Sequence, residues 1–100
     1  MFVHTVFFWA KPDASEGARR QLETDCRELL TGIPTVKKLI AGAPAMVDRP
    51  VVDNSYTVGL TVHFEDRAGH DVYQTHPIHL KFLERNKATW ERVVVYDFGE

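Results

Sequence analysis

Residues 2–9, FVHTVFFW, carry apolar side chains at nearly every position and end at the turn-forming triplet KPD. Such β-branched and aromatic residues favour a strand, in which successive side chains point to opposite faces of the sheet. Both faces of this strand are mainly apolar, so we expect both to be covered. One face would carry Phe2, His4, Val6 and Phe8, and the other Val3, Thr5, Phe7 and Trp9.

The same patterns divide the rest of the chain. Apolar residues recur at helical spacing after Ser15, a residue suited to a helix N-cap, and stop at Gly32 and Pro34. In the next alternating stretch one face would carry Tyr56, Val58, Leu60, Val62 and Phe64. The predicted elements are a helix over 16–33, strands over 36–42, 55–65 and 90–98, a surface loop over 43–54, and helices from the Asp66 cap to about Thr75 and from Pro77 to about Ala88.

This order, β-α-β-β-α-β, predicts the α+β class, a ferredoxin-like protomer with a four-stranded antiparallel sheet and helices on one face. One hundred residues fit a single domain over residues 1–100. One layer of helices leaves the second face of the first strand open. A second copy of the chain is the simplest cover and predicts a two-fold homodimer. The alternative is a monomer with a partly apolar open face.

The composition limits the classes of partner that the protein is expected to bind. The net charge is −2 and charges of both signs are mixed along the chain, so we expect no nucleic-acid partner and no membrane contact. No apolar run approaches the ~20 residues of a membrane span. Residues 1–13 lack a positively charged start and are interpreted as a strand, not a signal peptide. Cys26 is the one cysteine, which excludes an intrachain disulfide and favours a cytoplasmic location.

The stretch YQTHPIHLKF, residues 73–82, carries the most suggestive chemistry. Pro77 suits the first turn of a helix, with Thr75 or His76 at the cap. His79 then lies in that first turn, near the positive end of the helix dipole, which favours a neutral imidazole able to accept a proton. The hydroxyl of Tyr73, in the last turn of the preceding helix, would reach the same region.

His4 enters an otherwise apolar strand face and needs a hydrogen-bonding partner there. Each of these residues also has a purely structural explanation. A histidine beside a proline is often a cap, and a strand histidine among apolar residues is often a satisfied core group. His70, on a polar helix, and His63, on the face assigned to the dimer, are weaker candidates.

A metal centre is not expected, because no second H-x-x-H pair and no H-E-x-x-H pattern complements His76 and His79. The glycines are isolated, so no nucleotide-binding loop is predicted, and no Ser or Cys lies in a nucleophile elbow. We therefore expect no cofactor.

Three stretches, FVHTVFFWAKP, YQTHPIHLKF and VVVYDF, together resemble the stress-responsive A/B barrel (Dabb, dimeric α/β-barrel) domain family. The resemblance covers nearly the whole chain, and the Tyr-x-x-His-Pro-x-His block is its most specific part. It implies a ferredoxin-like protomer whose sheet joins that of a second copy in a barrel-shaped homodimer. It also implies a small-molecule pocket between sheet and helices.

One plant branch of that family has cofactor-free polyketide cyclase activity through intramolecular aldol condensation. The resemblance places its catalytic histidine and tyrosine at His79 and Tyr73 and its pocket histidine at His4. A further histidine of that branch, after a Tyr-Thr pair, is replaced here by Val58.

The mechanism that the resemblance implies is a proton transfer next to a carbonyl of a small keto or phenolic compound. His79 would abstract the proton, Tyr73 would hydrogen-bond the enolate, and His4 would orient the reactants. Two alternatives stay open: a non-enzymatic, stress-associated dimer or binding module, and a cofactor-independent monooxygenase, suggested by fold analogy. The remaining pocket residues would be Phe8, Leu60, His76, Phe82 and Leu83.

Overall fold

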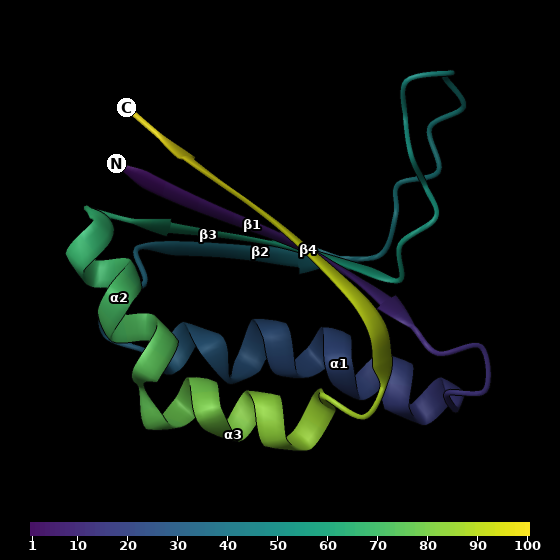
Figure 1. Cartoon of the computed structure of the whole chain (residues 1–100), viewed down its shortest axis with the longest axis horizontal. Helices are drawn as coiled ribbons and strands as arrows, with labels where there is room; N and C mark the ends of the chain where they lie inside the picture. Colours follow the sequence, from purple (N-terminus) through teal and green to yellow (C-terminus); the bar gives the residue numbers. More distant parts are fainter.

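Four strands form one antiparallel sheet in the order β2-β3-β1-β4, and the helices cover one of its faces in the computed structural model, which describes residues 1–100 (Figure 1). This confirms the predicted ferredoxin-like α+β fold. The elements are β1 (Phe2–Ala10), α1 (Glu16–Glu28), the 3₁₀ helix η1 (Leu30–Gly32), β2 (Lys38–Gly42), β3 (Val58–Phe64), α2 (Arg67–Thr75), α3 (Pro77–Asn86) and β4 (Trp90–Gly99).

Capping side chains begin the three α-helices where the sequence predicts. Ser15 Oγ accepts a hydrogen bond from the Ala18 amide at 3.0 Å, and Asp66 Oδ1 accepts one from the Gly69 amide at 2.9 Å. His76 is the N-cap of α3. Each cap satisfies an amide that would otherwise lack a partner at the helix start.

Several predicted boundaries differ from the structure, and β2 begins at Lys38 instead of residue 36. The first helix ends at Glu28 and continues as the tighter η1 turn instead of running to residue 33. The third strand begins at Val58, so Tyr56 precedes it and its ring lies 4.8 Å from that of Phe7 on the open face. The Thr57 hydroxyl accepts a hydrogen bond from the Ala10 amide, which interrupts the regular ladder before Tyr56.

The core lies between the sheet and the helices. The helix-facing residues of β1 and β3 alternate with less buried neighbours, as the pattern of apolar residues predicts. Asp25 on α1 also ties the helices together, because Arg85 Nε and Asn86 Nδ2 each donate to it at 2.8 Å. Twelve apolar residues form the core: Val6, Phe8, Leu22, Cys26, Leu30, Ile33, Val58, Leu60, Val62, Phe64, Tyr73 and Phe82.

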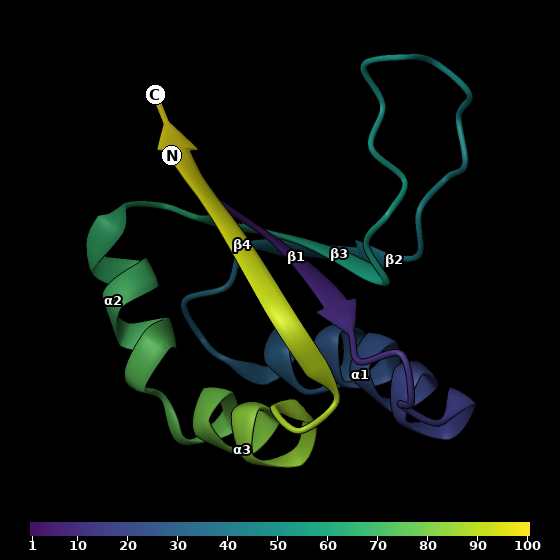
Figure 2. The ribbon, with the colours of Figure 1, turned by 45° about the vertical axis from the view of Figure 1, so that its right-hand side comes forward.

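No helix covers the opposite face of the sheet, which we call the open face (Figure 2). Tyr96 and Phe98 on β4 are 62% and 63% exposed there, and Ile40 on β2 is 57% exposed. Gly59 leaves room for the rings of Phe7 and Tyr56, since a Cβ would meet them at 3.4 and 3.3 Å. The segment between β2 and β3 projects beyond this face (Figure 1). None of the helices has the length and apolar character of a membrane-spanning segment.

Candidate functional site

A cavity of about 210 Å³ lies on the helix side of the sheet, between α2, α3 and the edge strand β4. We call it the site cavity. It has room for roughly seven waters at 30 Å³ each, so it suits a compound of about one ring. Polar groups are few among its apolar walls. It is lined by His4, Val6, Phe8, Leu60, Tyr73, Gln74, His79, Phe82, Leu83, Trp90, Val93 and Val95.

The break between α2 and α3 sets the direction of the two histidines. α2 ends at Thr75, His76 is extended, and Pro77 starts α3 at the first helical position. His76 Nδ1 accepts a hydrogen bond from the Ile78 amide at 3.1 Å, so its ring caps α3. It is absent from the cavity lining, which corrects its predicted place in the pocket. His79 follows one turn later and lines the cavity.

Burial keeps the imidazole of His79 neutral. Desolvation is the largest cause of its lowered pKa, and the nearby His4 and His70 lower it further, while the Gln74 carbonyl acts in the opposite direction. The predicted neutral state thus arises here chiefly from burial. Nδ1 is sealed inside the protein, and even the Gln74 carbonyl does not reach it with hydrogen-bonding geometry. Nε2 is therefore the ring nitrogen that a ligand in the cavity can reach.

Tyr73 presents a protonated hydroxyl beside this imidazole. Its ring centroid lies 4.8 Å from that of His79, and the side chain is 1% exposed. Desolvation raises the pKa of the phenol well above its usual value, with a smaller contribution from Cys26. Tyr73 therefore stays a hydrogen-bond donor at neutral pH and does not supply a phenolate base.

His4 has a charged partner that the sequence did not identify. Its Nδ1 lies 2.6 Å from Asp97 Oδ1, and the two residues face each other across β1 and β4. Burial lowers the pKa of His4, and the hydrogen bond to Asp97 opposes this effect. The carboxylate fixes the orientation of the ring and favours a proton on Nδ1. The sequence predicts that His4 needs a hydrogen-bonding partner. Asp97 provides it because β1 and β4, which are distant in sequence, pair so that the two residues lie opposite each other.

His70 lies beside the site residues in a position that the sequence did not indicate. Its ring stacks on Phe2 with centroids 4.6 Å apart and lies 4.8 Å from that of His4. In the sequence His70 is flanked by Gly69 and Asp71, which suggests a solvent-exposed position. Val72 and Tyr73 are consecutive apolar residues, so they do not show which face of α2 points inward. The pattern therefore gives little sign that His70, one turn before Tyr73, shares that inward face.

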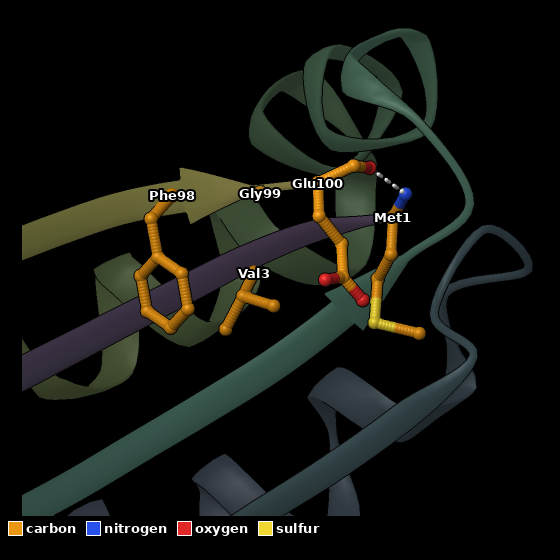
Figure 3. Close-up of a pocket in the computed structure, with 5 residues that line it drawn as sticks. All are labelled: Met1, Val3, Phe98, Gly99 and Glu100. Carbon is orange, nitrogen blue, oxygen red and sulfur yellow. Dashed lines mark hydrogen bonds between the residues drawn. The ribbon is translucent and has the colours of Figure 1, made fainter.

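A second hollow, of about 220 Å³, lies on the other side of the sheet at the chain ends (Figure 3). Val3 and Phe98 line it, and the Met1 amino group donates to the Glu100 backbone oxygen at 2.9 Å. Glu100 supplies its one ionisable side chain. Without a converging acid and base, this hollow offers less chemistry than the site cavity.

The site cavity thus joins a neutral imidazole, a phenolic donor and a carboxylate-paired histidine within apolar walls. Such a set is suited to moving a proton and stabilising an oxyanion without a cofactor. The fold and this site define a ferredoxin-like protein with a ligand-sized cavity between sheet and helices.

The chain belongs to the stress-responsive A/B barrel domain family, whose model matches residues 2–100. This confirms the resemblance seen in the three sequence stretches. The comparison with curated proteins finds no match.

Solved structures with the same fold come from bacteria and plants. A Dabb family protein of Mesorhizobium loti shares 24% identity over 99% of this chain and 95% of its own, with a TM-score of 0.80. A dimeric ferredoxin-like protein of Thermobifida fusca shares 21% over 99% and 90%, with a TM-score of 0.81. A hydroxynitrile lyase of Passiflora edulis shares 24% over 97% and 90%, with a TM-score of 0.77.

Proposed function

We propose that this protein binds a small keto or phenolic compound in the site cavity and transfers a proton at the carbon next to a carbonyl, an aldol-type step without a cofactor. The observation that carries the proposal is the pairing of His79 and Tyr73 in one cavity. Burial holds the first as a neutral acceptor and the second as a protonated donor.

The two residues have separate roles in this step. His79 takes the α-proton through Nε2, because Nδ1 is sealed from the cavity. The electron pair left on carbon delocalises onto the carbonyl oxygen, and the Tyr73 hydroxyl donates a hydrogen bond to that enolate. The enolate carbon then attacks a second carbonyl, and the new C–C bond forms as the π bond of that carbonyl breaks. The imidazolium gives its proton to the resulting alkoxide, which regenerates the neutral base.

His4 positions the reactants. Its hydrogen bond to Asp97 turns the ring so that the same side chain lines the cavity. The apolar walls, including Phe8, Leu60 and Phe82, lower the polarity around these groups, and the cavity opens to solvent at β4, where Val95 is 45% exposed.

Two features limit the substrate. Val58 is 1% exposed and is absent from the cavity lining, so the additional histidine of the cyclase branch has no counterpart here. The cavity is also smaller than the 300 Å³ or so that drug-sized ligands need. Both favour a compact ketone or phenol over a long polyketide chain.

The Passiflora edulis neighbour, named a hydroxynitrile lyase, supports the proposal only through its fold, given 24% identity. Adding cyanide to a carbonyl and adding an enolate to a carbonyl both require one group to handle a proton and another to hold an oxyanion. The site cavity offers one residue for each task.

We also propose that two chains form a homodimer through their open faces, in a cytoplasmic setting. The exposed side chains of Ile40, Tyr96 and Phe98 form an apolar surface with no cover in the chain. Several neighbours of this fold are described as dimeric, including the Thermobifida fusca protein.

Deuterium exchange into a small ketone tests the catalytic proposal without knowledge of the natural substrate. Cyclohexanone in D₂O is followed by proton NMR, with the tag-free protein in catalytic amounts. The wild type should accelerate loss of the α-proton signal at least about a hundredfold over His79→Asn, the usual range for a positioned base. If the wild type exchanged the α-proton no faster than His79→Asn, the catalytic proposal would be wrong and the non-enzymatic binding module would be the remaining interpretation.

His76→Asn is the matched control, because it removes the neighbouring histidine while Asn still caps α3. Its exchange rate should equal that of the wild type. A rate lost equally in both variants would show that the histidines act through the helix break and not through the cavity.

A further inference from the structure

Three residues from distant parts of the chain converge at one end of the site cavity. His4 comes from β1, His70 from α2 and Asp97 from β4, and one potential ligand atom of each lies within 4.8 Å of the others. We propose that this cluster is a binding site for a divalent transition-metal ion of the zinc type. The spacing along the chain gives no sign of it, which is why the sequence predicts no metal centre.

An unsatisfied nitrogen is the first argument for this site. His70 Nδ1 is buried and makes no hydrogen bond, while the exposed Asp71 carboxylate approaches it to 3.5 Å. A buried imidazole nitrogen without a hydrogen bond can take a ligand. The other ring nitrogen, Nε2, contacts the Gln74 side-chain amide at 2.9 Å, so Nδ1 is the nitrogen left for a ligand.

Gln74 also supplies the outer support that metal-binding histidines need. In the structure the Gln74 amide nitrogen donates to His70 Nε2, which places the ring proton on Nδ1. Coordination through Nδ1 requires a half-turn of this amide, after which its oxygen accepts from Nε2–H and Nδ1 has a free lone pair. A hydrogen bond of this kind fixes the ring and increases the basicity of the ligating nitrogen.

The donor set identifies the class of ion. Two imidazoles and one carboxylate, with positions open for water or substrate, suit zinc and its first-row neighbours. Magnesium and calcium prefer oxygen ligands throughout and fit less well. Burial lowers the pKa of His4, so its neutral form is available to coordinate.

Coordination requires the cluster to rearrange. Ligand atoms at about 2.1 Å from one tetrahedral ion lie about 3.4 Å apart. The ligand atoms of the cluster are separated by up to 4.8 Å, so His70 has to approach the other two residues. His4 Nδ1 and Asp97 Oδ1, now 2.6 Å apart, have to separate so that the ion can take the place of the proton between them. Since His4 also lines the site cavity, the ion would lie beside the bound ligand.

Zinc titration of the tag-free, chelator-treated protein tests the site. Calorimetry should give about one zinc per chain, and cobalt should produce visible absorption bands of a histidine–carboxylate site. His70→Phe keeps the stacked ring and Asp97→Asn keeps the shape, yet each should weaken zinc binding at least about tenfold. Zinc should also raise the melting temperature of the wild type but not of these variants.

Two matched controls isolate the cluster. His76→Asn removes a histidine outside the cluster, whose ring caps α3, and should leave zinc affinity unchanged. His79→Asn keeps all three ligands and should bind zinc as the wild type does, so this inference stands or falls separately from the proton-transfer proposal. The proposal would be wrong if the wild type bound no stoichiometric zinc, or if both His70→Phe and Asp97→Asn kept its zinc affinity. The His4–Asp97 contact would then be a hydrogen bond and not part of a metal site.

Discussion

Phe7 and Phe8 are consecutive residues of β1 with opposite surroundings. Phe8 is 4% exposed and lies against Trp90 and Phe82, with ring centroids 4.8 and 6.1 Å away. Phe7 is half-buried on the open face, beside Tyr56 and Tyr96. Two faces of equal apolarity therefore differ in what covers them: helices of the same chain on one side, and nothing within the chain on the other.

The candidate catalytic side chains all lie on the covered face. His4, Tyr73 and His79 all lie there, and burial is the largest cause of the pKa shift of each. The polar groups of the open face include the hydroxyls of Thr5 and Thr61, whose oxygens are 3.4 Å apart, and the side chain of His63, which pairs with Val3. The covered face thus suits catalysis, because desolvation tunes its acids and bases, while the open face suits assembly.

Truncating the two phenylalanines tests this contrast most strongly. Phe8→Ala should lower the free energy of unfolding by about 3–5 kcal/mol, because it removes a fully packed ring. Phe7→Ala should cost less than half as much at protein concentrations where the chain is monomeric. Urea denaturation measured by fluorescence gives both values, and equal losses would mean that the open face is already packed as a core.

A charge on the open face should break the dimer without unfolding the chain. Phe98 is 63% exposed, so Phe98→Asp costs the isolated fold little. In a sheet-to-sheet dimer it buries a carboxylate and should raise the dissociation constant at least about thirtyfold, or 2 kcal/mol. Sedimentation should then report the 11.4 kDa chain mass.

Val95→Asp is the control for assembly. Val95 lies three residues earlier on β4, is 45% exposed, and pairs with Val6 on the helix side. It should leave sedimentation unchanged. A monomeric wild type, or dimers lost in Val95→Asp and kept in Phe98→Asp, would remove the basis for assembly through the open face.

Local patterns predicted the fold well. Alternation placed His4, Val6 and Phe8 on one face of β1, and all three are buried. Capping chemistry located the starts of the helices, because a cap acts within a few residues. The errors fall where regular pairing stops, as at Tyr56, which lies before the last β1–β3 pair at Val58 and whose ring contacts Phe7.

The residues of the site were harder to predict from the sequence than the fold. His79, Tyr73 and His4 were predicted to share a pocket, and all three line the cavity, although their roles stay predictions. Asp97 and His70 could not be found by spacing, because cross-strand register and helix rotation bring them to His4. His76 was misplaced, since a residue before proline at a helix start can turn either way until its hydrogen bond is known.

Protonation of the covered face should make stability depend on pH. The folded-state pKa of His79 is lowered from 6.5, with His4, His70 and Tyr73 facing it, so the unfolded chain binds the proton more tightly. Stability is therefore complete above pH 6.5 and falls as pH decreases through the lowered folded pKa, by at most about 1.4 kcal/mol per pH unit for this one group. Urea midpoints across this range should show a shallower decline in His79→Asn. An unchanged slope would mean that His79 is charged in the folded protein.

The smallest expected effect on stability is also the sharpest test of the site. Tyr73→Phe removes one oxygen from a side chain that is 1% exposed. A buried hydroxyl with a structural partner would cost about 1 kcal/mol or more when removed. No such bond shifts the pKa of Tyr73, whose causes are desolvation and Cys26 alone. The variant should therefore unfold within about 0.5 kcal/mol of the wild type, as a substitution that breaks no packed or hydrogen-bonded contact does.

The same oxygen should matter far more for the reaction than for the fold. If it stabilises the enolate, Tyr73→Phe should slow ketone exchange by about a hundredfold, the usual result of losing one oxyanion donor. Leu60→Val, which trims the same cavity without touching a polar group, is the matched control and should change exchange only slightly. A Tyr73→Phe variant that loses stability and keeps activity would reverse the assignment, because the hydroxyl would then belong to the core and not to the chemistry.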